Sequence, residues 1–144
     1  MLTPRQKLIL STLATADRTS FAPVQVQKIF FLIDNNIQNE IGGAQFSFAP
    51  YDYGPFDKDV YRELNDLSEK GLVSIENPAA TALRKYSLTD YGVIVGKQNL
   101  SNYSPRGQKY MSDVVAWVCR LSFAELVGAI YAAYPDMKTN SVFK

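Results

Sequence analysis

The sequence contains no histidine and a single cysteine, Cys119. Without imidazole, neither a Ser-His nor a Cys-His nucleophile pair can form, and the commonest metal ligand is missing. A lone thiol cannot form an internal disulfide, and a zinc site would need further ligands. The apolar helical run around Cys119 predicts a buried, structural side chain. Only carboxylates, lysine and tyrosine remain for catalysis, and their spacing favours no enzyme, so we expect no catalytic residue, cofactor or metal.

Long apolar runs are also missing. None approaches the roughly 20 residues that a membrane-spanning helix needs. The apolar run Leu8–Leu10 near the N-terminus is too short for a secretory signal. We therefore expect a cytoplasmic protein without membrane contact. Its 144 residues, 47% hydrophobic and 20% charged, are typical of one globular domain.

Capping residues and apolar residues at helical spacing predict six helices. These begin near Pro4, Pro23, Asp57, Asp90, Pro105 and Phe123. Two short strands over 72–76 and 85–89 flank a tip at 77–84, and alternation predicts a third strand over 45–49. Two prolines and a glycine predict an irregular loop over 50–56, and a polar loop is expected from Asp34 to Gly43. The fourth helix is expected over 90–95, followed by a candidate hinge over 96–104.

A helix followed by two strands and a tip is the order in which a wing follows a helix-turn-helix. The predicted fold class is therefore mainly α with a small β-wing (α+β), a winged-helix-like domain with extra C-terminal helices. We expect the winged-helix-like domain to span residues 1–95. Residues 96–144 would form a C-terminal helical extension packed on it, in a single structural unit.

Three motifs carry a resemblance to known proteins. Residues 26–32 (VQKIFFL) resemble an "LQKLLFLL" helix, residues 48–56 (FAPYDYGPF) resemble an "F-x-x-Y-x-Y-G-P-F" signature, and residues 86–92 (YSLTDYG) resemble a "Y-x-L-T-x-x-G" segment. On these residues the chain is similar to the YwgA-like proteins and the related Panacea, or SocA-like, antitoxin domains. The resemblance covers residues 1–95, and the Tyr-Pro and Asn-Ser pairs near the C-terminus resemble the tail of the YwgA-like branch. It implies a winged-helix-like fold found among antitoxins, phage-related proteins and regulators.

The Tyr-Gly-Pro-Phe segment is a candidate surface for a partner protein, since aromatic side chains on a rigid backbone bind at low entropic cost. The candidate partner-binding residues are Tyr51, Tyr53, Gly54, Pro55, Phe56, Lys58 and Arg62. The alternative is that Pro55 and Phe56 only set the start of the next helix and pack beneath it. A stacking platform for single-stranded nucleic acid is disfavoured, because residues 45–56 contain no lysine or arginine.

Charge is unevenly distributed along the chain. Residues 34–76 contain nine acids and three bases, whereas residues 77–110 contain five bases and one acid. The helix that would enter a DNA groove, over 57–70, carries five acids and three bases, which opposes contact with phosphates. Arg84 and Lys85, beside the tip, are the candidates for nucleic-acid binding. Self-association, docking to a charged partner and ordinary scatter of surface charge are also compatible with this pattern.

These observations lead to two functional hypotheses. The first is a non-enzymatic, antitoxin-like protein-binding module in a prokaryotic toxin–antitoxin or phage-defence setting, with a toxin or another defence component as partner. The second is a winged-helix DNA-binding transcriptional regulator that uses Arg84 and Lys85. Homodimer formation stays open, as does the placement of the last helix, on its own domain or exchanged between two chains.

Overall fold

The computed structural model describes residues 1–143 and is mainly helical, with two small antiparallel sheets. The α-helices are α1 (Pro4–Ala14), α2 (Pro23–Asn36), α3 (Gln38–Ile41), α4 (Lys58–Glu69), α5 (Asp90–Leu100), α6 (Pro105–Arg120) and α7 (Phe123–Ala133). The strands are β1 (Ala49–Tyr51), β2 (Gly54–Phe56), β3 (Val73–Glu76) and β4 (Lys85–Leu88), and the 3-10 turns are η1 (Thr81–Leu83) and η2 (Pro135–Lys138). The predicted α+β class, mainly α, is confirmed. Within residues 1–143, no helix has both the length and the apolar character needed to cross a bilayer.

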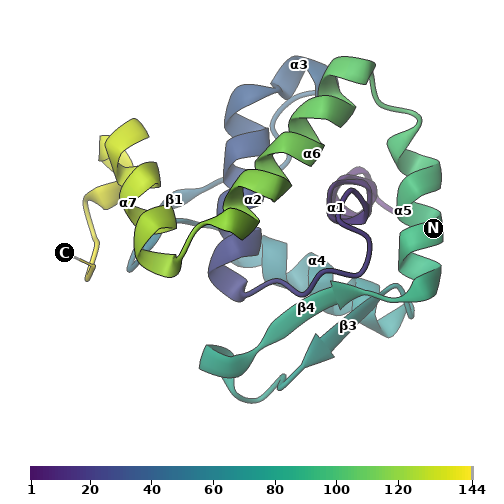
Figure 1. The fold of residues 1–144 in the computed structure, drawn as a ribbon, viewed down its shortest axis with the longest axis horizontal. Coiled ribbons are helices and arrows are strands. Elements are labelled where there is room, and N and C mark those ends of the chain that lie inside the picture. Colours follow the sequence, from purple (N-terminus) through teal and green to yellow (C-terminus); the bar gives the residue numbers. More distant parts are fainter. Residues whose placement is uncertain (144) are drawn as a thin grey trace.

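Helix α1 lies among α5, α6 and the β3–β4 hairpin (Figure 1). It begins with a capping box between Thr3 and Gln6, and every residue from Leu8 to Ala14 is buried. Helices α4, α5 and α6 and strand β4 all contact it. Helix α5 approaches most closely, because a Cβ atom at Gly96 would lie 2.5 Å from the Leu10 carbonyl oxygen. Burial on all sides explains why the apolar residues of α1 do not form a single stripe.

Helix α2 forms the second layer of the core. Its predicted stripe of Val26, Ile29, Phe30 and Ile33 is fully buried, against α6 on one side and strand β2 on another. Just before this helix, Phe21 exchanges backbone hydrogen bonds with Tyr86 of β4, at 2.7 and 2.9 Å. Because β4 also pairs with β3, it lies between Phe21 and β3 in the sheet.

The segment between α2 and α4 differs most from the sequence-based prediction. The strand expected over 45–49 and the loop expected over 50–56 are wrong, since β1 and β2 form a hairpin across that boundary. Two prolines do not break this pairing, because Pro50 and Pro55 lie opposite each other and neither needs to donate to the ladder. Gly54 has a φ of +102°, which favours glycine. The polar loop expected from Asp34 is also wrong, because α2 continues to Asn36 and α3 follows.

Two expectations for the second half of the chain also need correction. The helix expected over 90–95 extends to Leu100, so the proposed hinge begins inside a helix. Its glycines do not end it, because Gly92 and Gly96 lie against backbone carbonyls of neighbouring segments. Cys119 is exposed on α6, not buried, and partial desolvation raises the pKa of its thiol. The division into residues 1–95 and 96–144 stays a prediction.

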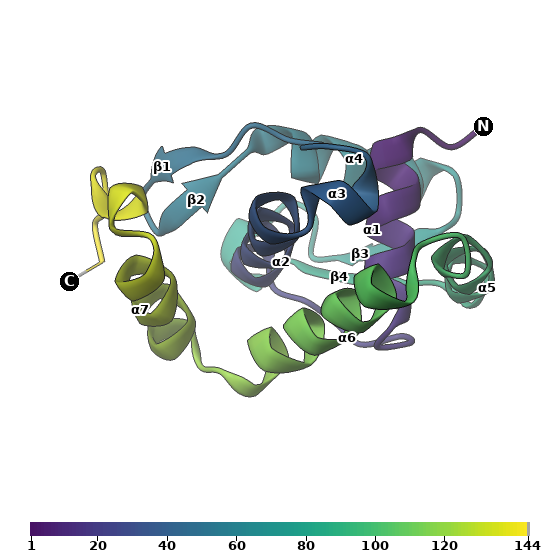
Figure 2. The same cartoon turned by 90° about the horizontal axis from the view of Figure 1, so that it is seen from above.

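Helix α7 and the following residues form one end of the molecule, beside the β1–β2 hairpin (Figures 1 and 2). The predicted capping box of Ser122 and Glu125 is confirmed, and α7 ends just before Pro135. Leu126 and Ile130 are buried as predicted. In this structure the last helix therefore packs against the hairpin of its own chain.

Candidate partner-binding site

A row of aromatic side chains joins the two hairpins. Tyr51 of β1 stacks on Phe56 with ring centroids 4.9 Å apart, and Phe56 contacts Tyr61 of α4 at 5.7 Å. Tyr61 in turn stacks on Tyr86 of β4 at 6.0 Å. Exposure falls along the row, from 54% at Tyr51 to 0% at Tyr86. The row is therefore anchored in the core at Tyr86 and exposed to solvent at Tyr51.

The outer face of α4 borders this row. Lys58, Arg62, Asn65 and Glu69 are exposed and lie three or four residues apart, which places them on one face of the helix. Lys58 and Arg62 are the members nearest the hairpin in the sequence. Two bases therefore belong to the exposed face of the helix that follows the hairpin.

The acids of α4 mostly face the other way. Asp59 and Glu63 lie 3.1 and 3.7 Å from the guanidinium of Arg5 on α1. Asp66 pairs with Lys70 at 3.1 Å, and hydrogen bonds from Lys70 and Gln6 hold the pKa of its carboxyl below the usual value. The excess of acids over bases in residues 57–70 therefore does not describe the exposed face. The inference against DNA that used this excess stays a prediction, because the net charge of a helix is not the charge of its outer surface.

Three buried polar side chains of α2 hold the hairpin segment in place. The Gln27 amide exchanges two hydrogen bonds with the backbone of Asp57, both at 2.9 Å. Lys28 is 3% exposed, and its Nζ donates to the Pro55 carbonyl oxygen at 3.2 Å. The Asp34 carboxylate accepts hydrogen bonds from two backbone N–H groups of residues 45 and 46, at 2.7 and 2.8 Å. Burial lowers the pKa of Lys28 to about 7 and raises that of Asp34.

Sequence reasoning missed these three residues. The signal for them is weak but present, since Gln27 and Lys28 stand directly between the apolar residues Val26 and Ile29 of a helix that continues apolar to Ile33. A polar pair inside such a run indicates either a solvent-facing side or a buried contact with backbone groups. Only the packing of the hairpin over α2 shows that these side chains make buried contacts with backbone groups.

The predicted partner-binding residues are brought together but are not equally accessible. Gly54 and Pro55 are buried and Phe56 is half-buried, whereas Tyr51, Tyr53, Lys58 and Arg62 are exposed. Pro55 therefore packs beneath the surface, as the alternative interpretation expected, while Tyr51 is free for contact. Tyr53, at the hairpin tip, contacts Phe123 of α7 with ring centroids 5.1 Å apart.

The two predicted nucleic-acid-binding residues lie at the other hairpin. The Arg84 guanidinium donates to the Pro78 carbonyl oxygen and lies 3.5 Å from the Tyr86 hydroxyl, so it is tied to its own tip. Lys85 is exposed at the start of β4. Of the two bases, Lys85 is thus the one available for phosphate contact.

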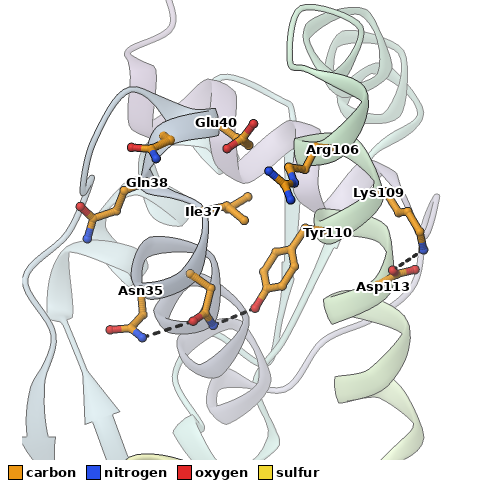
Figure 3. A pocket seen from close by; sticks show the side chains of 10 residues that line it. Asn35, Ile37, Gln38, Glu40, Arg106, Lys109, Tyr110 and Asp113 are labelled. Carbon is orange, nitrogen blue, oxygen red and sulfur yellow. Dashed lines mark hydrogen bonds and ion pairs between the residues drawn. The ribbon is translucent and has the colours of Figure 1, made fainter.

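A separate polar concavity of about 770 Å³ lies between the α2–α3 region and α6 (Figure 3). Its lining includes four side-chain amides, at Asn35, Asn36, Gln38 and Asn39. The Asn36 amide donates to the Tyr110 hydroxyl at 2.8 Å, and Lys109 pairs with Asp113 at 2.7 Å. Because this lining holds two acids, Glu40 and Asp113, and two bases, Arg106 and Lys109, the concavity favours no ligand of one charge sign.

Within residues 1–143, no three acidic or cysteine side chains are grouped so as to hold a metal ion. Comparison with family models, with curated proteins and with solved structures gives no match for this chain. The function is therefore inferred from the residues and their geometry.

Proposed function

We propose that this chain is a non-enzymatic protein-binding module of the antitoxin-like, winged-helix type. The observation that carries the proposal is the exposed Tyr51 ring, stacked on Phe56. Phe56 contacts Tyr61 of α4, and the exposed face of that helix carries Arg62. Tyrosine and arginine are among the residues enriched where binding energy concentrates at protein interfaces. The buried contacts of Gln27 and Lys28 fix the hairpin in advance, which lowers the entropic cost of binding.

The order of the elements supports the winged-helix assignment. Helix α1, the bridge at Phe21, α2, α4, β3 and β4 follow one another along the chain, and β4 lies between Phe21 and β3. In a winged helix the last strand likewise lies between the first two. Helix α4 then takes the place of the recognition helix, and residues 37–57 are an insertion that carries the β1–β2 hairpin.

The biological setting follows from the resemblance to the YwgA-like and Panacea domains. On this proposal the partner is a toxin or another defence component of a prokaryotic cell, and both proteins are cytoplasmic. Binding alone would hold the partner inactive, since an interface of this kind requires no covalent chemistry.

The proposal can be tested with the full chain and a partner identified by co-purification from cells that contain both. The dissociation constant of the purified pair is measured by titration calorimetry. Tyr51→Ala and Arg62→Ala should each weaken binding by roughly tenfold or more, as expected of residues at the centre of an interface. The matched control, Arg84→Ala combined with Lys85→Ala, should leave the dissociation constant unchanged. Unchanged affinity in both Tyr51→Ala and Arg62→Ala would exclude this surface.

A transcriptional regulator that binds DNA is the second candidate, and the charge arrangement on α4 favours it. Asp59 and Glu63 face Arg5 of α1, while the exposed face of α4 carries Lys58, Arg62, Asn65 and Glu69, and Arg62 also pairs with Asp59 at 3.1 Å. Duplex binding would weaken steeply with salt, and each lost phosphate contact should lower the slope of log K against log salt by about 1. A slope lowered by about 1 in each of Arg62→Ala and Lys85→Ala, with no protein partner affected by Tyr51→Ala, would favour the regulator.

A further inference from the structure

A small pocket of about 190 Å³ lies between the end of α2, the segment that precedes β1, and the turn η2. Its apolar wall consists of three phenylalanine rings, Phe31, Phe46 and Phe48, and the Met137 side chain. Phe31 and Phe46 are only 4% and 6% exposed, so they form the buried part of this wall. An apolar cavity of about 150 Å³ holds a molecule the size of benzene, so this pocket has room for a compact group of similar size.

The three rings are held at steep angles to one another. Phe31 and Phe48 lie 5.6 Å apart between ring centroids with an interplanar angle of 82°, and Phe46 and Phe48 lie 5.9 Å apart at 59°. Tyr134 packs on Phe31 at 4.8 Å, and Phe30 packs on Phe46 at 6.3 Å. Because these contacts fix the rings within the fold, the aromatic wall is formed before any ligand binds, which lowers the entropic cost of binding.

Asp34 gives the pocket a negative charge. Of the described residues that line the pocket, Asp34 is the only charged one, and the polar remainder consists of the exposed amides of Asn35 and Gln38. Asp34 is 5% exposed, and its two carboxylate oxygens each accept one backbone N–H, from Gln45 and Phe46. Burial nevertheless raises the pKa of the Asp34 carboxyl. A cation in the pocket would therefore stabilise the ionised carboxylate.

The nearby base Arg5 does not cancel this charge. The Arg5 guanidinium lies 4.8 Å from the Phe46 ring centroid, so this ring already takes part in one cation–π contact. Arg5 pairs in turn with Asp59 and Glu63 of α4, at 3.1 and 3.7 Å. Because two acids offset the charge of Arg5, the Asp34 carboxylate stays available to a second cation.

The chemistry of the wall selects the kind of cation. A primary ammonium group has three N–H donors that need acceptors, and phenylalanine rings and a thioether offer few. A quaternary ammonium group has no N–H, and its methyl groups can pack against aromatic rings whose π electrons attract the charge. The apolar wall and the single acid therefore favour a quaternary ammonium group.

We propose that the pocket bounded by Phe31, Phe46 and Phe48 binds a small organic cation with a quaternary ammonium group, and that Asp34 supplies the counter-charge. Groups of aromatic side chains recognise quaternary ammonium ligands through cation–π contacts. The pocket shares no residue with the candidate partner-binding site, and neither proposal depends on the other.

The test uses the full chain, labelled with carbon-13 at its methionine methyl groups and titrated with choline. The chain contains three methionines, of which Met137 lines the pocket, whereas Met1 and Met111 do not. Choline should shift the Met137 methyl resonance until it saturates and leave the other two in place. The matched control ligand is 3,3-dimethyl-1-butanol, which has the shape of choline with carbon in place of the charged nitrogen. Its dissociation constant should be at least roughly tenfold higher than that of choline.

Two variants test the ring and the carboxylate separately. Phe48→Leu keeps an apolar side chain at a half-buried position and should weaken choline binding at least roughly fivefold, with little change for the neutral alcohol. Asp34→Asn removes the charge at nearly constant shape and should have the same selective effect. The matched control, Phe123→Leu, replaces an exposed ring outside the pocket and should leave the binding of both ligands unchanged.

Absence of a saturable shift at Met137 in the parent protein would overturn the proposal. Equal affinity for choline and the neutral alcohol would also overturn it, as would unchanged choline binding by a Phe48→Leu protein that circular dichroism shows to be folded. Should either variant fail to fold, the comparison of the two ligands on the parent protein decides.

Discussion

Lys28 should make the stability of this protein depend on pH in the neutral to alkaline range. Burial lowers the pKa of its amine from 10.5 to about 7. Between these values the unfolded chain binds a proton that the folded chain has released, so the free energy of unfolding rises with pH. Stability is lowest below pH 7, and the full gain is reached only above the unfolded pKa.

The expected change is large enough to measure. One pKa unit corresponds to about 1.4 kcal/mol, so the free energy of unfolding should rise by roughly 2 kcal/mol from pH 7 to pH 9. At pH 7 the burial of this amine lowers the free energy of unfolding by roughly 4 kcal/mol. Lys28→Met removes this cost but leaves the Pro55 carbonyl oxygen without its donor, a loss of about 1–3 kcal/mol. The variant should therefore be more stable than the parent protein by about 1–3 kcal/mol at pH 7, and its stability should be flat with pH.

The assay is urea unfolding followed by circular dichroism at pH 7, 8 and 9. The chain has no histidine, so few other side chains titrate in this window. Cys119→Ser in both proteins removes the thiol as a further source of pH dependence. A free energy of unfolding that is constant or falls between pH 7 and pH 9, or a slope that persists in Lys28→Met, would refute the reasoning.

Three further predictions concern stability, each measured by urea unfolding. Gln27→Ala leaves the buried Asp57 N–H unpaired, while the Asp57 carbonyl oxygen keeps the Val60 N–H, and it should lower the free energy of unfolding by roughly 1–3 kcal/mol, with a loss below 0.5 kcal/mol contradicting this. Gly96→Ala should lower it by roughly 2–4 kcal/mol because α5 must move away from α1. Its control Gly128→Ala, where a methyl group meets open space, should raise it by up to about 1 kcal/mol, and equal effects would be inconsistent with the packing. Gly54→Ala should lower the free energy of unfolding by about 1–3 kcal/mol because Gly54 has a positive φ. An unchanged free energy of unfolding would argue against the hairpin turn.

Local signals were sufficient where an element depends on its own residues. Capping by Thr3, Ser104 and Ser122 predicted the starts of three helices, because the cap side chain bonds to a backbone N–H within three residues. The strands flanking the tip at 77–84 and the buried stripe of α2 were also predicted, because their patterns involve only residues that are close in the sequence. The candidate partner-binding residues were also named from the sequence, since they are contiguous in it. Their unequal exposure was not predictable.

The sequence by itself determined the α+β composition, the helix boundaries set by caps, and the short contiguous segment that carries the exposed aromatic residues. Only the tertiary structure decided that Asp59 and Glu63 face Arg5, that Lys28 is buried beneath the hairpin, and that residues 140 and 142 contact the hairpin. The physical reason is the difference in sequence separation over which these interactions act. Caps and helical periodicity act between residues a few positions apart, whereas burial and charge pairing depend on segments separated by tens of residues, whose approach is set by the packing of the whole core.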